Sequence, residues 1–286
     1  MTADAYRLSQ PATRTTSVVF ASPHSGRDYP ASFLARASLD RHEIRSSEDA
    51  FVDDLFATAT DHGAVFLQAR APRAFLDLNR ACEELDPALI EGVRRQAHNP
   101  RIASGLGVIP RVVANGRAIY RGKLPLAEAQ VRLDTYWHPY HDTLQSLLDE
   151  SHAIFGEAIL VDCHSMPHEA LESVGRPGRR PEVVLGDRFG AAAGAVIMER
   201  VEAAFAAAGF RVKRNMPFAG AYVTQTYGRP SRGQHAIQVE IDRAMYMDED
   251  SVTPLPAFDD VRRALNGAIA DIAAIGQPLD CPMAAE

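Results

Sequence analysis

Cysteine is scarce in this sequence, and its scarcity excludes two kinds of small domain. Cys82, Cys163 and Cys281 are the only cysteines, and they lie far apart along the chain. Three scattered thiols cannot form a disulfide framework or a zinc site built from pairs of cysteines. We therefore expect reduced thiols, which are typical of the cytoplasm.

Long apolar runs and an excess of positive charge are also missing. No window approaches the roughly 18 consecutive apolar residues of a membrane-spanning helix, and the first residues show neither the basic nor the apolar part of an export signal. The formal net charge is −7, which argues against a nucleic acid or an anionic membrane as a partner. We expect a soluble cytoplasmic protein with neither partner.

The chain is otherwise ordinary for a globular protein. Its 286 residues can bury a sizeable core, and 46% of them are hydrophobic and 23% charged. No linker or repeat divides the chain, so we expect one domain over residues 1–286. Strand-like apolar runs alternate with segments of helical periodicity, which predicts an α/β sandwich around a parallel or mixed sheet. Strands are expected at residues 17–22, 64–67, 74–77, 159–165, 183–186, 210–212 and 236–241, and helices at 46–63, 133–148, 191–208 and 258–275.

One long segment, residues 82–123, shows no clear periodicity and is punctuated by glycine and proline. A connection of this length inside a compact chain is usually a functional loop, and we predict that it lids the cleft. In the helix that follows, Pro139 is expected to cause a kink or a new start. His138 and His141 lie three residues apart there, and packed or solvated histidines are favoured over a metal-binding pair.

Polar side chains stand where several predicted strands end, which is where open α/β sheets place their ligand sites. Two histidines and one carboxylate can form a three-ligand zinc site that leaves a position for water, whose pKa the zinc lowers. A further carboxylate must then carry a proton from the water to the leaving nitrogen. This pattern predicts a metal-dependent hydrolase. The residues concerned are His24, Asp77, Asn79, Arg80, Asp162, His164 and Glu240, together with Asp49 at the start of a predicted helix.

Each of these residues also has a simpler explanation. Asp49 could belong to a capping box with Ser46, and the pattern alone favours that interpretation. Asp162 could orient a histidine or cap the end of a strand. Glu240 alternates with apolar neighbours, so a functional role and an exposed strand face are about equally supported. Cys163 is expected to be a small buried side chain, because alternation along the strand turns it away from the neighbouring histidine.

Six short blocks occur in an order that resembles the N-formylglutamate amidohydrolase family. Any one block is weak, but the ordered set is specific and extends over roughly residues 18–250. The blocks are residues 23–26 (Pro-His-Ser-Gly), 48–49 (Glu-Asp), 75–80 (Phe-Leu-Asp-Leu-Asn-Arg), 137–141 (Trp-His-Pro-Tyr-His), 162–165 (Asp-Cys-His-Ser) and 233–240 (Gly-Gln-His-Ala-Ile-Gln-Val-Glu).

The resemblance implies a relation to zinc carboxypeptidases and aspartoacylases, and with it a three-layer α/β sandwich, a mixed central sheet and one catalytic zinc per chain. It implies that His24, Asp49 and His164 are the zinc ligands, which for Asp49 outweighs the capping box. Glu240 is implied to be the general base and acid. The implied substrate-binding residues are Asn79 and Arg80, which would grip a carboxylate, with Arg73, Ser165, Thr224 and His235.

The implied reaction is zinc-dependent hydrolysis of the amide bond of N-formyl-L-glutamate, a step of histidine degradation. A similar N-acyl amino acid or a small peptide-like amide is the alternative substrate. A non-catalytic binder of a small acidic metabolite is the alternative outside enzymes, but a binder has no use for a general base such as Glu240. The sequence gives no indication of the oligomeric state.

One departure from the family pattern concerns substrate specificity. Members that act in histidine breakdown tend to read Gly-Gly-His-Ile-Thr-Arg-His-Tyr-Gly where residues 220–228 read Gly-Ala-Tyr-Val-Thr-Gln-Thr-Tyr-Gly, so Gln225 stands in the place of an arginine. If that arginine binds the side-chain carboxylate of the substrate, its loss removes a contact of roughly 1.5–3 kcal/mol. Arg229, Arg232 or the basic loop around Arg176 are candidate replacements.

Overall fold

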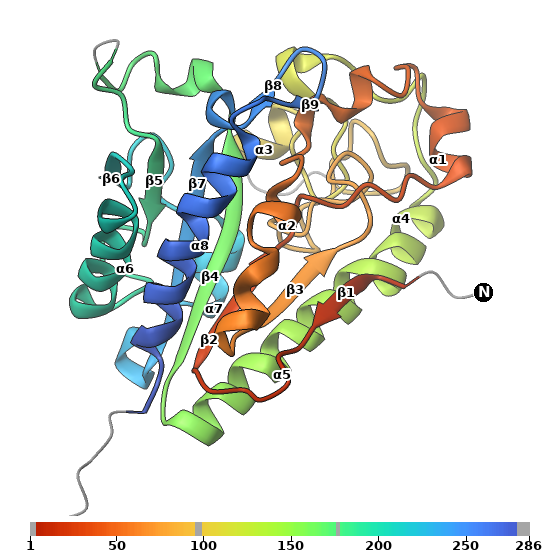
Figure 1. Ribbon diagram of the computed structural model, residues 1–286. Coiled ribbons are helices and arrows are strands. Elements are labelled where there is room, and N and C mark those ends of the chain that lie inside the picture. Colours follow the sequence, from red (N-terminus) through yellow and green to blue (C-terminus); the bar gives the residue numbers. More distant parts are fainter. Residues whose placement is uncertain (1–3, 95–98, 176–177, 279–286) are drawn as a thin grey trace, which may run out of the picture.

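A mixed sheet of seven strands runs through the middle of the computed structural model, which describes residues 4–94, 99–175 and 178–278 (Figure 1). The strand order is β1-β3-β2-β4-β7-β5-β6. The pairs β3–β2, β2–β4 and β4–β7 are parallel, whereas β1 runs antiparallel to β3 and β5 runs antiparallel to β7. The strands are β1 Tyr6–Ser9, β2 Val18–Ser22, β3 Val65–Ala69, β4 Ala158–Met166, β5 Val183–Gly186, β6 Val212–Arg214 and β7 Gln234–Asp242.

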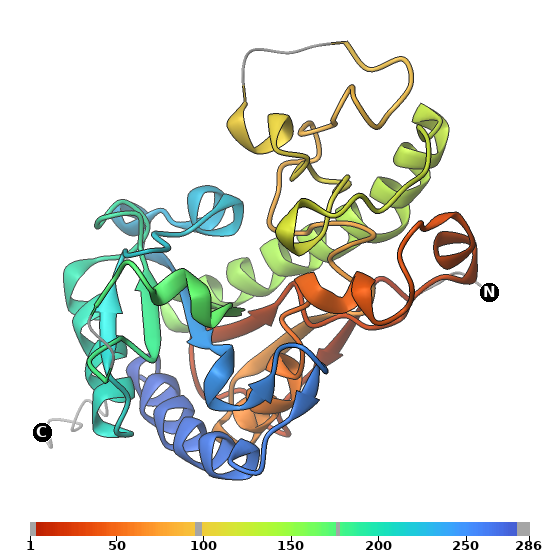
Figure 2. The same ribbon diagram turned by 90° about the horizontal axis from the view of Figure 1, so that it is seen from above.

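Helices cover both faces of this sheet, which confirms the predicted three-layer sandwich with a mixed central sheet. Figure 2 shows α8 (Phe258–Ile275) and α5 (His138–Phe155) on opposite sides of the strands. We call the two sides the α8 face and the α5 face. The α8 face also carries α6 (Ala195–Ala207) and α2 (Val52–Leu55), and the α5 face also carries α7 (Tyr222–Tyr227).

The two central strands, β4 and β7, are nine residues long and buried at every position. Residues 158–161 of β4 form a continuous apolar run, as expected for a strand that is covered on both faces, whereas β7 alternates polar and apolar residues. Side chains alternate between the faces. Cys163 and Val239 accordingly belong to the core on the α8 face, whereas Leu160 and Ala236 belong to the core on the α5 face.

Proline and glycine set several boundaries as predicted. A π-helical turn, Leu133–Trp137, ends where α5 begins at His138, with Pro139 in the first turn of α5. The backbone is right-handed helical at both Trp137 and His138, so the helix continues, and the disturbance expected from proline takes the form of this π-helical turn. Gly63 ends the 3-10 helix Ala57–His62 with a φ of 76°, a conformation that glycine adopts without steric cost.

Two predicted elements are wrong. Residues 74–77 form no strand: the amides of Phe75 and Leu76 both bond to the carbonyl of Pro72 in a turn, although both side chains are buried in the core. The apolar run correctly indicated burial, but burial alone does not require strand pairing. The predicted helix 46–63 is broken into three short pieces, Glu43–Ser47, Val52–Leu55 and Ala57–His62, with Phe51 at a φ of 66° between them.

The predicted irregular segment at residues 82–123 is largely confirmed where the structure describes it. Its described residues contain only the short helix α3 (Pro100–Ala103) and the 3-10 turn Ala114–Gly116. In the described part of the chain, no helix is both long and apolar enough to cross a bilayer. The remaining short elements are α1 Ala31–Arg36, α4 Leu126–Arg132, β8 Met247–Asp248, β9 Thr253–Pro254 and the 3-10 turns His168–Leu171, Pro230–Arg232 and Arg243–Met245.

Candidate active site

A cavity of about 790 Å³ opens at the carboxyl ends of β4 and β7. His164 and Glu240 lie opposite each other in the register of these two strands, and both line the cavity. Residues 101–116 of the irregular segment supply much of the facing wall. The position agrees with the rule that ligands bind outside the carboxyl ends of parallel strands.

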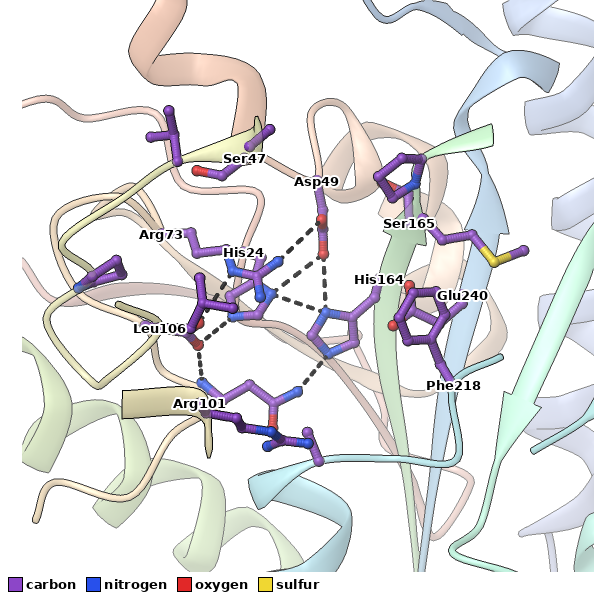
Figure 3. Close-up of a pocket in the computed structure, with 18 of the residues that line it drawn as sticks. His24, Ser47, Asp49, Arg73, Arg101, Leu106, His164, Ser165, Phe218 and Glu240 are labelled. Atoms are coloured by element: carbon purple, nitrogen blue, oxygen red, sulfur yellow. Dashed lines mark hydrogen bonds and ion pairs between the residues drawn. The ribbon is translucent and has the colours of Figure 1, made fainter. Parts of the chain in front are cut away.

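Three buried side chains converge at the base of this cavity (Figure 3). His164 Nδ1 lies 3.1 Å from His24 Nδ1 and 2.9 Å from Asp49 Oδ2, and His24 Nδ1 lies 3.4 Å from the same carboxylate oxygen. One potential ligand atom from each residue falls within 4.8 Å of the others. Two imidazole nitrogens and one carboxylate oxygen form a donor set that suits a metal ion such as zinc.

The other nitrogen of each imidazole is held by a second carboxylate. His24 Nε2 lies 2.7 Å from Asp77 Oδ1, and His164 Nε2 lies 2.9 Å from Asp162 Oδ2. When Nε2–H donates to these carboxylates, both Nδ1 atoms present their lone pairs to the same point. Carboxylate–histidine pairs of this kind orient metal-binding imidazoles and fix their tautomer. The residues present therefore fit a bound cation.

Asp49 is oriented by a buried arginine that the sequence analysis missed. Arg243 donates through NH2 to Asp49 Oδ1 at 2.9 Å, which leaves Oδ2 facing the histidines, and its Nε lies 3.2 Å from Ser165 Oγ. The interpretation of Asp49 as part of a capping box is wrong, since Ser46 lies inside the 3-10 helix Glu43–Ser47 and its hydroxyl donates to the Glu43 carbonyl. The Asp49 side chain lines the cavity. The sequence signal for Arg243 is its position directly after β7, at the same sheet edge as Glu240.

The protonation of the cluster follows from burial and these close contacts. Burial alone would raise the pKa of Asp49, but hydrogen bonds from His164 and His24 hold that pKa well below its usual value. Burial alone would lower the pKa of His164, but Asp162 and Asp49 raise it well above the ordinary value of a histidine. The cluster therefore combines an ionised carboxylate with an imidazole of raised basicity, and both properties favour binding of a cation.

Glu240 lies beside this cluster on β7 and is only 7% exposed. Burial, together with the charge of Asp49, raises the pKa of its carboxyl to about 7. Gln238 donates from Nε2 to Glu240 Oε1 at 2.7 Å and also lines the cavity, a contact that the sequence analysis did not identify. A carboxyl group with a pKa close to neutral can both accept and release a proton at physiological pH.

The structure brings five of the predicted substrate-binding or neighbouring polar residues to the cavity. Asn79 bonds within the site, since its Oδ1 accepts from the Val223 amide at 2.8 Å and its Nδ2 lies 3.3 Å from His164 Nε2. Such contacts suit a role of Asn79 in positioning other groups of the site. The residues at the cavity are Arg73, Asp77, Asn79, Arg80 and Ser165.

His235 and Thr224 do not line the cavity. Five positions separate His235 from Glu240 on β7, so it lies near the opposite end of the strand, where its Nδ1 accepts a hydrogen bond from the Gly194 amide at 3.0 Å. An odd separation along a strand also directs the two side chains to different faces. Thr224 is buried in α7, and its hydroxyl donates to the Ala221 carbonyl.

The residues considered for specificity and for a second metal pair also lie elsewhere. Gln225 is exposed on α7, and neither it nor Arg229 nor Arg232 belongs to the described lining of the cavity. Arg176 lies outside the described residues. His141 is buried between the Tyr227 hydroxyl and the Leu78 carbonyl, which confirms the packed interpretation.

A sheet-edge cavity that combines this donor cluster with a carboxyl group of near-neutral pKa defines a hydrolytic enzyme of α/β fold. The family model for N-formylglutamate amidohydrolase matches residues 16–247. An N-formylglutamate deformylase from Pseudomonas aeruginosa is 31% identical over 255 residues, covering 87% of this chain and 88% of the relative, and one from Pseudomonas putida is 32% identical over 212 residues, covering 72% and 74%. The chain belongs to the N-formylglutamate amidohydrolase family, whose members hydrolyse an amide bond.

Solved structures agree with this assignment. The crystal structure of N-formylglutamate amidohydrolase from Ralstonia eutropha JMP134 superposes with a TM-score of 0.89 at 32% identity and covers 96% of this chain and 99% of that one. A gene product from Agrobacterium tumefaciens has a TM-score of 0.64 at 16% identity, with 96% of each chain covered, and shares the fold. The expected relation to zinc carboxypeptidases stays a prediction.

Proposed function

We propose that this protein is a zinc-dependent deformylase that hydrolyses N-formyl-L-glutamate to formate and L-glutamate. The observation that carries the proposal is the convergence of His24, Asp49 and His164 beside Glu240 in a chain of this family. The relatives from both Pseudomonas species are named N-formylglutamate deformylases, which supports the choice of substrate.

In the proposed mechanism, His24, Asp49 and His164 would hold one zinc ion per chain. When bound there, zinc supplies Lewis acidity toward a water molecule and toward the acyl oxygen of the substrate. Asp77 and Asp162 keep the two imidazoles in the tautomer that leaves Nδ1 free, and Arg243 keeps Asp49 Oδ2 turned toward them.

Glu240 carries the proton in this mechanism. Its carboxylate accepts a proton from the attacking water, and the resulting carboxylic acid donates that proton to the leaving nitrogen as the C–N bond breaks. A pKa of about 7, set by burial, suits both transfers. Gln238 holds the carboxylate in place through Nε2. Arg80 at the cavity wall supplies a guanidinium for a substrate carboxylate.

The direct test is formate release from N-formyl-L-glutamate by zinc-loaded protein, with the metal content of the same sample measured. We expect one zinc per chain, loss of formate release on chelation and its return when zinc is added. N-acetyl-L-glutamate and the N-formyl derivatives of other amino acids define specificity in parallel. Cleavage of another amide with no cleavage of N-formyl-L-glutamate would contradict the substrate, and full activity after complete metal removal would contradict the mechanism.

A further inference from the structure

Four arginines among the described residues line the cavity, and they differ in whether a carboxylate forms an ion pair with them. Arg73 lies 3.1 Å from Asp77 Oδ2 through Nε and 4.0 Å from Asp49 Oδ1 through NH1. Arg243 donates to Asp49. These two guanidinium groups are therefore paired with Asp49 and Asp77, the carboxylates of the donor cluster and its support.

The other two, Arg80 and Arg101, make no ion pair with any residue that the structure describes. Arg80 bonds only to backbone carbonyls, through Nε to Leu106 at 3.0 Å and through NH1 to Asn79 at 2.7 Å. These contacts fix the direction of its side chain but neutralise no charge. Arg101 is exposed, and its guanidinium has no hydrogen bond to a described residue. Among the described residues, the cavity therefore holds two guanidinium groups without a direct ion pair.

Backbone contacts hold these two arginines next to each other. The Leu106 amide donates to the Arg101 carbonyl at 2.8 Å, while the Leu106 carbonyl accepts the bond from Arg80 Nε. Asn99 caps α3 by accepting from the Arg101 amide at 2.9 Å. Figure 3 draws Arg101 and Leu106 among the residues that line the pocket. Burial lowers the pKa of Arg80, and the positive charges of Arg73 and Arg101 lower it further, against the opposing charges of Asp77 and Glu84.

Two neighbouring cations in one cavity match a ligand that carries two carboxylates. Neighbouring like charges without direct ion pairs favour binding of a dianion, and guanidinium groups bind carboxylates through paired N–H donors. We propose that Arg101 is the specificity-determining residue that binds the second carboxylate of a dicarboxylic N-acyl amino acid, while Arg80 binds the first. This inference rests on the proposed function and extends it to the choice of amino acid.

The assignment also explains how glutamate specificity survives with Gln225 on α7. Gln225 is exposed and stands outside the described lining of the cavity, whereas Arg101 lines it from the irregular segment. In this chain the charge that recognises the side-chain carboxylate comes from α3.

The test compares Arg101→Gln with wild type on N-formyl-L-glutamate and on its neutral isostere N-formyl-L-glutamine. For N-formyl-L-glutamate we expect kcat/KM to fall about 10-fold to 100-fold, mainly through KM, because one charge-assisted contact is lost. For N-formyl-L-glutamine we expect no change. Arg101→Lys should restore part of the loss, since it keeps the charge without the planar fork.

Arg121→Gln is the matched control, because Arg121 is exposed in the same irregular segment, lies outside the cavity and changes the net charge equally. It should behave as wild type on both substrates. An equal loss on both substrates in Arg101→Gln, or no loss on either, would overturn the assignment.

Binding of the product separates this inference from the proposed function. Calorimetry of the zinc-loaded protein should show L-glutamate binding more tightly than L-glutamine in wild type and with equal affinity in Arg101→Gln. If wild type does not cleave N-formyl-L-glutamate but binds L-glutamate through Arg101, the proposed reaction fails and the dicarboxylate site stands. If Arg101→Gln leaves L-glutamate affinity unchanged, or wild type does not bind L-glutamate, the inference about Arg101 fails whatever the reaction.

Discussion

The two walls of the cavity are built in different ways. The strand wall consists of β4 and β7, whose buried side chains His164 and Glu240 are held by the backbone pairing of the two strands. The segment wall consists of residues 101–116, which are irregular apart from two short turns and carry the exposed Arg101. In the proposed function, Glu240 and one metal ligand, His164, lie on the sheet, whereas Arg101, proposed to recognise the substrate, lies on the irregular segment.

The largest expected effect is the loss of turnover when Glu240, the proposed proton carrier on the strand wall, is replaced. Glu240→Gln keeps the shape of the side chain and its bond from Gln238 but removes the group that accepts and returns the proton. We expect kcat to fall by about 10²-fold to 10⁴-fold with zinc content unchanged. Steady-state kinetics with metal analysis measure both. Glu150→Gln, an exposed control on α5, should change neither, and turnover retained in Glu240→Gln would refute the proposed role.

Glu240→Gln should also raise the stability of the metal-free protein, in contrast to a substitution on the segment wall. Burial raises the pKa of Glu240 from 4.5 to about 7, so the folded protein prefers the neutral acid. Stability from this group is complete below its unfolded pKa and is lost as the pH rises toward 7. In metal-free protein, Glu240→Gln should be more stable than wild type by up to about 3 kcal/mol at pH 8, and equal to it near pH 4.

Denaturant unfolding at both pH values measures this difference. Arg101→Gln, on the exposed segment wall, should leave stability unchanged at either pH. A Glu240→Gln variant that is no more stable at pH 8 would show that Glu240 is already ionised at no cost in the folded, metal-free protein.

Replacing a carboxylate that orients one of the proposed metal-binding histidines should have a smaller effect. Asp77→Ala removes the carboxylate that holds His24 Nε2, so we expect the affinity for zinc to fall by about 10-fold to 100-fold. Asp54→Ala is the control, since Asp54 pairs only with the exposed Arg27 at the surface. Competition with a chromophoric chelator measures both, and unchanged affinity in Asp77→Ala would remove this carboxylate from the proposed site.

The smallest expected effect is a difference in hydrogen exchange between the two walls. Amides of β4 and β7 are buried in the sheet and should exchange slowly with or without ligand. The amides of Ala103, Ser104 and Leu106 bond within the short turn around α3. Saturating L-glutamate should slow their exchange in wild type but not in Arg101→Gln. Equal protection of both walls, or no change around α3, would contradict the predicted division of roles.

The strand wall could be largely predicted from the sequence, because the patterns that indicate it lie within short stretches of the chain. β4 begins with a continuous apolar run, β7 alternates polar and apolar residues, and polar residues toward the carboxyl ends of both indicate a site. Placing Asp49 in that site needed the family resemblance, since the local pattern favoured a capping box. The predicted strand at residues 74–77 failed because an apolar run indicates burial without indicating a pairing partner.

The segment wall could not be predicted beyond its existence. Residues 82–123 lack periodicity, and nothing in that stretch indicates that Arg101 faces the cavity while Arg121 faces away. The direction of Arg101 depends on tertiary contacts, among them the bond of Leu106 to Arg80. Arg243 was missed for a related reason, because its partner Asp49 lies far away in the chain. Arginines that act through distant partners leave little trace in local sequence.

The parallel pairing of β4 with β7 also bears on how the protein folds. Residues 167–233 lie between the two strands, and the cluster further gathers His24 and Asp49 from the first part of the chain. Contacts of such sequence separation form slowly, because the intervening chain must be ordered before they contribute. No short fragment can hold the metal with all three residues. Zinc retention during refolding should therefore appear late, and it can serve as a reporter of the completed native topology.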